Sequence, residues 1–380
     1  MDIERGLIKL ISRSPEFYFN KFRKHYKKFS VEKGLNIVLF GAAEMAKIYI
    51  EQFRKNSINV IAVCDNDSSK EDKRLMGIKI IGLGTLVSKF PKTIPIVVTS
   101  IYDKEITEQL KELGFNNVWD FKYFSVFHSR QIENPHWISS INPILKNKNK
   151  ILRVFNLLKD KNSRRTYYGV IKYRLYMERN LIDMVASNRN EEYFNNKIIK
   201  IGENDIYVDG GAFNGDTLLK FIEASKGKFK KAYVFEPDSK NYKKLSSSVK
   251  NLDNGIRSKI VKLALGLGER NEKLRFSNEG ALGSRISEKG KFVDIVSLDS
   301  FIKEDTPTLI KMDIEGAELN ALKGSVKLIR KHKPKFAICI YHKPAHLWDI
   351  PLLIKRFNSN YEFYVRHYSN SVYDTVLYAI

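Results

Sequence analysis

The sequence has 380 residues, of which 43% are hydrophobic and 12% aromatic, and its formal net charge is +23 at pH 7. This hydrophobic content excludes a disordered chain, and the length predicts two domains rather than one. No stretch of about 18 uncharged apolar residues occurs, and the N-terminus has no long apolar core. We therefore expect neither a membrane-spanning helix nor a signal peptide.

The two cysteines indicate the redox environment. Cys64 and Cys339 lie far apart in the sequence, each inside an apolar β-type run. Buried free thiols are therefore expected rather than a disulfide or a metal pair. This interpretation favours a reducing, cytoplasmic location.

The positive charge could indicate an anionic substrate, a nucleic acid or a membrane surface. Lysines are spread along the whole chain, however, which is typical of solvated surface positions, and the Asp/Asn-Pro-Pro-Tyr/Phe motif of base methylation is absent. We do not expect a nucleic acid partner. Within a basic helical arm at residues 1–34, the segment Lys21–Lys28 alternates cations with Phe22 and Tyr26. It predicts weak contact with the inner face of a membrane, the alternative being a solvated helix packed on the next domain.

Residues 35–124 have the pattern of a Rossmann-like α/β domain. A strand at 35–40 is followed by a turn at Gly41, a helix to about residue 53 and a second strand ending in Asp65. A further strand at 95–100 and a helix-strand pair at 106–121 extend the predicted sheet. The domain resembles the small nucleotide-binding-like domains found beside sugar-modifying transferases.

The glycines of a dinucleotide site are incomplete in this domain. Ala43 and Ala46 stand where the fingerprint requires glycine, and Glu44 adds a negative charge. We therefore expect a scaffold or substrate-recognition role. An NAD-dependent oxidoreductase built on this domain remains an alternative.

Residues 125–200 are predicted to be a helical connector, with breaks near Asn142-Pro143 and 146–150. Two segments, Ser163–Arg174 and Asn190–Phe194, contain more aromatic and cationic residues than a passive linker needs. Core packing explains most of this composition, and a lid over a binding site is the alternative.

The stretch Ile206–Thr217 combines a short apolar strand, a carboxylate, three glycines and the start of a helix. Glycines permit a tight turn and close approach of the backbone to a ligand. Gly211 and Gly215 are separated by three residues, which is not the spacing of a dinucleotide site. Asp209 would repel a pyrophosphate but suits a cationic ligand such as the amino group and sulfonium of S-adenosylmethionine.

Three later strands also end in chemically active residues. The strand 231–235 is followed by Glu236, at the distance where α/β folds place a ribose-binding acid. The strand 309–312 is followed by Asp313, and the strand 336–341 by His342. A helix at 347–357 and strands near 361–367 and 373–379 complete the chain.

Four motifs in this order resemble the FkbM family of S-adenosylmethionine-dependent methyltransferases. They are Asp-Gly-Gly-Ala-Phe-Asn-Gly-Asp-Thr, Phe-Glu-Pro-Asp, Lys-Met-Asp-Ile-Glu-Gly-Ala-Glu and Ile-Tyr-His-Lys-Pro. The resemblance covers roughly residues 200–380, with lesser similarity back to about 150. It implies a Rossmann-like methyltransferase domain at 201–380, with a mixed seven-stranded sheet whose last strand is antiparallel, and it places the connector over the cofactor cleft.

The motifs define a predicted cofactor site for S-adenosylmethionine. Asp209 and Gly211 line the methionine end, Asn214 to Thr217 oppose it, and Glu236 accepts the ribose hydroxyls. The adenine is expected near residues 263–265, with Ser284 as a further neighbour. The alternative for the glycines is a purely turn-forming role. The full set is Asp209, Gly211, Ala212, Asn214, Gly215, Asp216, Thr217, Glu236, Pro237, Ala264, Leu265 and Ser284.

Asp313, Glu315 and His342 are the candidate catalytic residues, because the family resemblance places them at one edge of the sheet. A sugar hydroxyl is poorly acidic and must lose its proton as the methyl group arrives. In one arrangement His342 is a general base oriented by a carboxylate. In the other, Asp313 and a neighbouring acid hold a divalent cation such as Mg²⁺. Alternatively, Glu315 only caps the following helix and His342 is only a turn residue.

The predicted function is methyl transfer to a hydroxyl of a sugar in a surface glycan or its activated precursor. The substrate would be a small-molecule, lipid-linked or nucleotide-linked sugar. Motifs of serine hydrolases, phosphate-binding loops and zinc proteases are absent. The alternative from another class is a glycan- or nucleotide-binding module whose methyltransferase fold is inactive.

Overall fold

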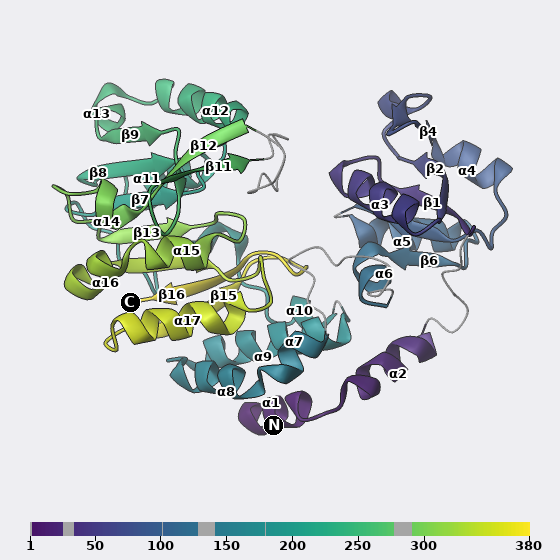
Figure 1. Ribbon diagram of the computed structural model, residues 1–380, viewed down its shortest axis with the longest axis horizontal. Coiled ribbons are helices and arrows are strands. Elements are labelled where there is room, and N and C mark those ends of the chain that lie inside the picture. The colour runs from purple at the N-terminus through teal and green to yellow at the C-terminus, as the bar shows by residue number, and fades with distance from the viewer. Residues whose placement is uncertain (1, 26–33, 101, 128–140, 179, 277–290) are drawn as a thin grey trace. The chain divides into compact units, whose positions relative to one another are not determined.

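The computed structural model describes the chain except for residues 1, 26–33, 101, 128–140, 179 and 277–290 (Figure 1). The chain forms two compact units, one of residues Ser14–Ile141 and one that joins Met1–Arg13 to Asn142–Ile380.

The expected basic arm contains two helices, α1 (Ile3–Ile11) and α2 (Pro15–His25), which fall into different units. Residues 26–28 of the segment Lys21–Lys28 lie outside the described residues, and its membrane contact stays a prediction. No helix in the described part of the chain is long and apolar enough to cross a membrane.

The unit at 14–141 contains a six-stranded sheet with the order β3-β4-β2-β1-β5-β6. All neighbours are parallel except the β3–β4 pair. The strands are β1 (Asn36–Phe40), β2 (Asn59–Cys64), β3 (Arg74–Leu75), β4 (Ile78–Ile81), β5 (Ile96–Val98) and β6 (Val118–Asp120). The helical elements are α3 (Glu44–Lys55), η1 (Ser68–Lys70), α4 (Leu83–Lys89), α5 (Asp103–Glu112) and α6 (Phe121–Phe127).

Apolar side chains of the central strands form the core of this unit. Val38, Phe40, Cys64 and Val98 are buried together with Leu110 of α5. Strands that are covered by helices on both faces read as continuous apolar runs, which is why β1 and β5 are visible in the sequence. A doubly wound α/β domain is confirmed here.

The second unit is built on a seven-stranded sheet with the order β15-β16-β14-β13-β7-β8-β9. The last strand, β16, is antiparallel to both of its neighbours, whereas the pairs from β14 to β9 are parallel. The predicted mixed sheet with an antiparallel last strand is therefore confirmed. The strands are β7 (Ile206–Gly210), β8 (Lys231–Phe235), β9 (Ile260–Leu263), β13 (Leu309–Met312), β14 (Lys335–Cys339), β15 (Phe363–His367) and β16 (Thr375–Ala379).

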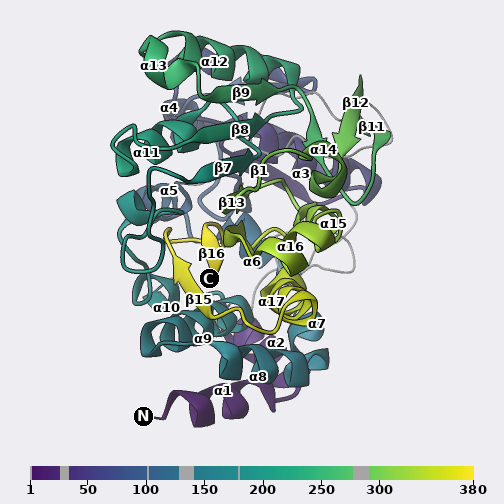
Figure 2. The same ribbon diagram turned by 90° about the vertical axis from the view of Figure 1, so that its left-hand side faces the viewer.

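Helices cover both faces of this sheet. Figure 2 shows α11 on one side and α15, α16 and α17 on the other. The helices after the first strand are α11 (Asp216–Ala224), α12 (Ser239–Lys250), α13 (Asn254–Arg257), α14 (Leu298–Phe301), α15 (Glu318–Lys323), α16 (Val326–His332) and α17 (His346–Phe357). A small separate sheet pairs β12 (Lys291–Val296) with β10 (Gly266–Leu267) and β11 (Glu272–Phe276).

The segment predicted as a connector packs closely against this unit. It contains α7 (Ile141–Lys146), α8 (Lys148–Leu157), α9 (Lys161–Tyr176), α10 (Asn180–Asp183) and η2 (Arg189–Glu191). Helix α9 contacts β15 and helix α8 contacts α17. Arg174 on α9 is buried and donates to the carbonyl oxygen of Tyr341 at 3.0 Å. This buried contact ties the segment to the end of β14, next to His342.

The core of the second unit is strongly aromatic. Tyr207 of β7 stacks on Phe221 of α11 with a centroid distance of 4.2 Å, and Phe194 packs against both rings. Large aromatic side chains bury more apolar area than any other residue type, so this cluster fixes α11 on the sheet. Cys64 and Cys339 are buried free thiols, as predicted.

Candidate functional site

The loop between β7 and α11 is held by backbone contacts to two neighbouring strands. Gly211 has φ +74°, and a side chain there would collide with the carbonyl oxygen of Asp313. The N–H groups of Gly211 and Ala212 both donate to the carbonyl oxygen of Phe235 at 3.0 Å. Glycine is therefore required at 211 by a close approach and not only by the turn. The contact places the loop beside Asp313, as the motif order predicted.

Asp209 pairs with a lysine in the interior of the unit. Its side chain is fully buried, and the Lys311 ammonium lies 3.0 Å from its carboxylate. The two residues are register partners on β7 and β13. Lys311 also donates to the carbonyl oxygens of Gly210 and Gly211, at 3.2 and 2.7 Å. The negative charge expected to attract a cationic ligand is thus offset inside the protein, and the pair anchors the loop instead.

Glu236 lies where β8 ends and accepts two backbone hydrogen bonds. One carboxylate oxygen accepts the N–H of Phe213 and the other accepts that of Asp238, both at 2.8 Å. Burial raises the pKa of the Glu236 carboxyl group to about 7, although these two donors oppose the shift. Each oxygen keeps a further lone pair, so the carboxylate can still accept hydroxyl donors.

The end of β9 lies next to Glu236, as expected for the adenine side. The N–H of Glu236 donates to the carbonyl oxygen of Leu263 at 3.0 Å. Ala264 is exposed, while Leu265 and Pro237 are half-buried. Ser284 lies outside the described residues.

The N-terminus of α11 is capped by polar groups of the loop itself. The Asn214 side chain accepts the N–H of Asp216 at 3.1 Å, and the Asp216 carboxylate accepts the N–H of Thr217 at 2.7 Å. Gly215 has φ +91° at the turn into the helix. Asp216 is exposed, so the open end of the loop is acidic and suits a cationic group better than a phosphate.

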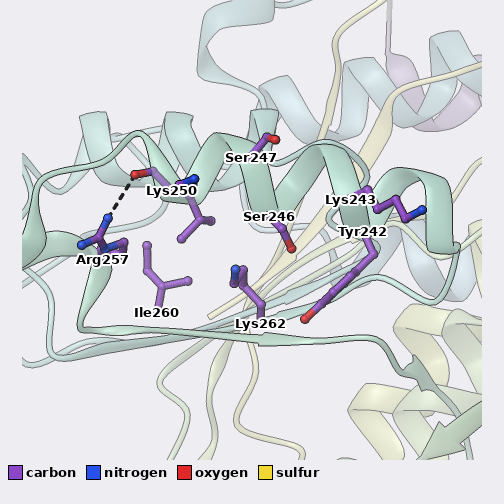
Figure 3. Close-up of a pocket in the computed structure, with 9 residues that line it drawn as sticks. Tyr242, Lys243, Ser246, Ser247, Lys250, Arg257, Ile260 and Lys262 are labelled. Carbon is purple, nitrogen blue, oxygen red and sulfur yellow. Dashed lines mark hydrogen bonds between the residues drawn. The ribbon is translucent and has the colours of Figure 1, made fainter.

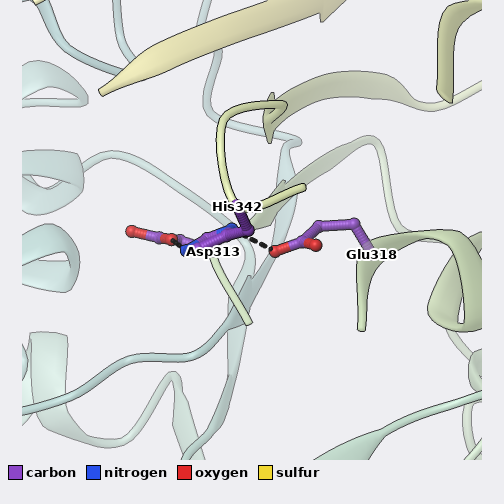
Figure 4. Close-up of side chains that lie close together, drawn as sticks. All are labelled: Asp313, Glu318 and His342. Carbon is purple, nitrogen blue, oxygen red and sulfur yellow. Dashed lines mark ion pairs between the residues drawn. The ribbon is translucent and has the colours of Figure 1, made fainter. Parts of the chain in front are cut away.

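His342 stands between two carboxylates (Figure 4). Its Nδ1 lies 2.9 Å from the Glu318 carboxylate, and its Nε2 lies 3.3 Å from Asp313 and 3.6 Å from Glu315. Glu318 is fully buried at the start of α15 and also pairs with His346 at 3.2 Å. Asp313 keeps 26% of its side chain exposed. Glu318, His342 and Asp313 therefore form a row, the His342 row, which runs from the core to an open edge of the sheet.

These neighbours determine the charge of the row. Burial alone would lower the pKa of His342, but Glu318, Asp313 and Glu315 raise it to about 9. Burial alone would raise the pKa of Glu318, but His342 and His346 hold it well below its ordinary value. At neutral pH the resting site therefore contains an imidazolium next to the ionised Glu318.

Asp313 is also held by two phenols. The hydroxyl of Tyr193 donates to it at 2.9 Å and that of Tyr341 at 3.4 Å. Tyr193 belongs to the aromatic segment 190–194, one of the two proposed as a lid. That segment therefore contacts the candidate site directly.

Glu315 does not cap a helix, contrary to the alternative interpretation of this residue. Helix α15 begins at Glu318, two residues later than expected, and Glu315 has φ +53° in the turn before it. Glu318 instead accepts the N–H groups of Ile314 and Gly316, at 3.0 and 3.3 Å. Glu318 thus holds this turn as well as His342.

Two family models match the chain. Residues 34–118 match the model "C2185-like, N-terminal", and residues 202–363 match the model "Methyltransferase FkbM domain". The second unit carries an FkbM methyltransferase domain. The predicted family is therefore confirmed, and the glycine loop, Glu236 and the His342 row all lie within this FkbM domain.

One solved structure shares the fold over the whole chain. The methyltransferase FkbM of Methylobacillus flagellatus KT is 23% identical, with a TM-score of 0.78 over 100% of this chain and 99% of its own. An rRNA methylase of Streptococcus thermophilus (14% identity, 47% and 88% coverage) and a Streptococcus mutans protein in complex with SAH (10%, 48% and 92%) each have a TM-score of 0.31. Such low scores say nothing about the site. No curated protein matches the chain.

The row in the FkbM domain fits a metal ion poorly. Asp313, Glu318 and His342 each offer a ligand atom within 4.8 Å of the others. The imidazole ring stands between the two carboxylates, however, and each of its nitrogens faces a different one (Figure 4). A metal site needs donors that converge on one point, with oxygen ligands about 2.0–2.6 Å from Mg²⁺ or Ca²⁺. The arrangement suits proton transfer instead.

Sequence reasoning did not assign Glu318, His346 or Lys311. A signal existed for each: Lys311 is a charge inside an otherwise apolar strand and needs a buried acid. His342 and His346 are four residues apart, and Glu318 ends the Asp-Ile-Glu-Gly-Ala-Glu motif. The partners of these residues come from other strands, helices and loops, so spacing alone could not identify them.

Proposed function

We propose that the FkbM domain transfers the methyl group of S-adenosylmethionine to a hydroxyl group of a sugar, in a surface glycan or in a lipid- or nucleotide-linked precursor. The observation that supports this best is the row of Asp313, His342 and Glu318 beside the glycine loop. The row provides a base whose direction is fixed, which transfer to a poorly acidic hydroxyl requires.

The residues around the loop fit S-adenosylmethionine. When bound, this cofactor supplies an electrophilic methyl group on a positively charged sulfur. Glu236 has free lone pairs for two ribose hydroxyls, and the end of β9, where the adenine is expected, lies beside it. Asp216 and Asp313 provide the negative charge that suits the cationic end, a role that Asp209 cannot fill.

The chain's own residues explain the proton transfer. Glu318 accepts a hydrogen bond from the protonated Nδ1 of His342. This contact leaves Nε2 directed toward Asp313 and the open edge of the sheet. Once His342 has lost its Nε2 proton, that nitrogen can take the hydroxyl proton of the acceptor. The resulting imidazolium is stabilised by the carboxylates that already surround it.

A carboxylate substitution tests the cofactor site. Glu236→Ala removes the acceptor of the ribose hydroxyls and should weaken S-adenosylmethionine binding by roughly 2–4 kcal/mol, because hydrogen bonds to charged groups are the stronger kind. Isothermal titration calorimetry of the full chain measures this change. Glu223→Ala, on the exposed side of α11, is the matched control and should bind as wild type does. Wild-type affinity in Glu236→Ala would contradict the site, and binding of NAD instead would favour the oxidoreductase alternative.

A second experiment tests the base. His342→Gln should lower kcat by about 10²–10⁴ on a sugar acceptor while S-adenosylmethionine affinity is kept. EDTA should leave turnover unchanged, since the row needs no metal ion. Loss of turnover in EDTA that Mg²⁺ restores would instead support the metal arrangement. Full activity of both His342→Gln and Asp313→Asn would exclude this row as the catalytic site.

A further inference from the structure

A groove lies between α12 and β9, away from the His342 row. Strand β9 is the outermost strand of the seven-stranded sheet, so one edge of its backbone is not covered by another strand. The groove has a volume of about 700 Å³ and an apolar base that includes Val249 and Ile260. Figure 3 shows side chains from α12, α13 and β9 around it.

Four cations line the groove, and the described part of the chain offers none of them a carboxylate partner. They are Lys243, Lys250, Arg257 and Lys262. The Arg257 guanidinium donates only to neutral oxygens, those of Lys250 and Asn254. Other lysines of the same unit do pair with acids, as Lys231 does with Asp305 at 2.7 Å. The groove therefore has an uncompensated positive charge.

Hydroxyl groups lie among these cations. In Figure 3, Lys262 rises from β9 toward α12, and Ser246 points down from α12 toward it. Tyr242 and Ser246 line the groove, both half-buried, and within the described residues neither hydroxyl group has a hydrogen-bond partner. Ammonium, guanidinium and hydroxyl donors together are typical of phosphate recognition.

The spacing of the cations indicates more than one anionic group. Lys243 and Lys250 are seven residues apart on one helix, which corresponds to about 10 Å along its axis. We infer that this groove binds a ligand with two or more phosphate groups, a second site distinct from the S-adenosylmethionine loop. The inference does not depend on methyl transfer, because its residues are not part of the proposed cofactor or catalytic site.

Inorganic phosphates of increasing length provide the test. Isothermal titration calorimetry of the full chain at low ionic strength should show tighter binding from orthophosphate to pyrophosphate to tripolyphosphate. Lys250→Met/Lys262→Met should weaken tripolyphosphate binding by about tenfold or more, because two charge-assisted contacts are lost. Lys331→Met, an exposed cation on α16, is the matched control and should bind as wild type does. Added salt should weaken wild-type binding.

The titration results distinguish the phosphate-site proposal from the methyltransferase proposal. No binding of tripolyphosphate by the wild-type protein, or equal binding by the double variant, overturns the phosphate site. Competition by phosphatidylglycerol vesicles, but not by phosphatidylcholine vesicles, would support the site and identify a lipid headgroup as the source. A lack of competition would support a soluble phosphate ester. S-adenosylmethionine affinity should be the same in the double variant, so failure of the methyltransferase proposal would not affect this result.

Discussion

His342 has a carboxylate near each of its ring nitrogens, and this placement determines both its charge and its direction. Glu318, which is buried, fixes Nδ1, while Asp313, which is partly exposed, faces Nε2. The family resemblance predicted that Asp313 and His342 meet at one edge of the sheet, and both do follow neighbouring parallel strands. It did not predict the charge of the pair, since that depends on Glu318, which reaches the ring from the start of α15.

The raised pKa of His342 predicts a pH-dependent rate. With a pKa of about 9, only a small fraction of His342 is neutral at pH 7. A general base acts in its deprotonated form, so kcat/KM should rise about tenfold per pH unit from pH 7 and level off above about 9. Initial rates between pH 6.5 and 10 measure this profile. A flat profile across the range would contradict His342 as the base.

Two amide variants serve as controls for the pH–rate profile. Asp313→Asn removes a carboxylate that raises the pKa of His342, so the rise should move to lower pH. Glu315→Gln should shift the profile less, since that carboxylate lies farther from Nε2 and is more exposed. Unchanged S-adenosylmethionine affinity over the same pH range would show that the profile reports the base.

At the scale of elements, much of the second unit could be read from the sequence. Strands β7, β8, β13 and β14 are buried runs with polar residues at their ends, and such a pattern is local. The contacts of α8 and α9 were not predictable, because an amphipathic pattern shows that a face is buried but not what it meets. The pairing of Asp209 was not predictable for the same reason, since its partner Lys311 is about a hundred residues away in the sequence.

The glycine loop offers a test at the element scale. Gly211→Ala places a methyl group against the carbonyl oxygen of Asp313, at a residue with positive φ. We expect a loss of about 1–3 kcal/mol in unfolding free energy and weaker S-adenosylmethionine binding, because the loop must shift. Gly255→Ala in α13 is the matched control, since nothing lies near its added methyl group. Urea unfolding and calorimetry measure both effects, and equal behaviour of the two variants would mean that the loop contact is unimportant.

At the scale of the whole molecule, the two units share one hydrogen-bonding feature. In each, the acid after the second strand of the first βαβ unit accepts an N–H from the first loop: Asp65 from Ala42 at 2.7 Å, and Glu236 from Phe213 at 2.8 Å. Asp65 also pairs with Lys70 at 2.9 Å, whereas no ion pair of Glu236 is found among the described residues. Within the described part of the chain, the acid of the FkbM domain is thus the one whose charge no cation offsets, which supports the cofactor site there rather than at residues 35–124.

The charge on His342 should also make the stability of the second unit depend on pH. Its folded pKa of about 9 exceeds the ordinary value of 6.5, so the folded state binds the extra proton. The stabilisation is complete below pH 6.5 and is lost as the pH rises through 9, with a slope of at most about 1.4 kcal/mol per pH unit. Glu192 and Glu236, whose carboxyl pKa values burial raises to about 7, change stability in the same direction but at lower pH. Burial also raises the pKa of the Cys339 thiol well above its ordinary value, so this thiol lowers stability as the pH approaches 9. The part of the slope between pH 7.5 and 9 that belongs to His342 is therefore the part that is lost when His342 is replaced.

Trp348, buried on α17, can report this effect in a Trp119→Phe/Trp137→Phe background. Urea unfolding followed by its fluorescence should give a free energy that falls between pH 7.5 and 9. With His342→Gln added, the free energy should fall less over that interval, since Gln does not titrate and His346 still pairs with Glu318. An equal slope with and without His342 would show that the proton responsible for the pH dependence binds elsewhere.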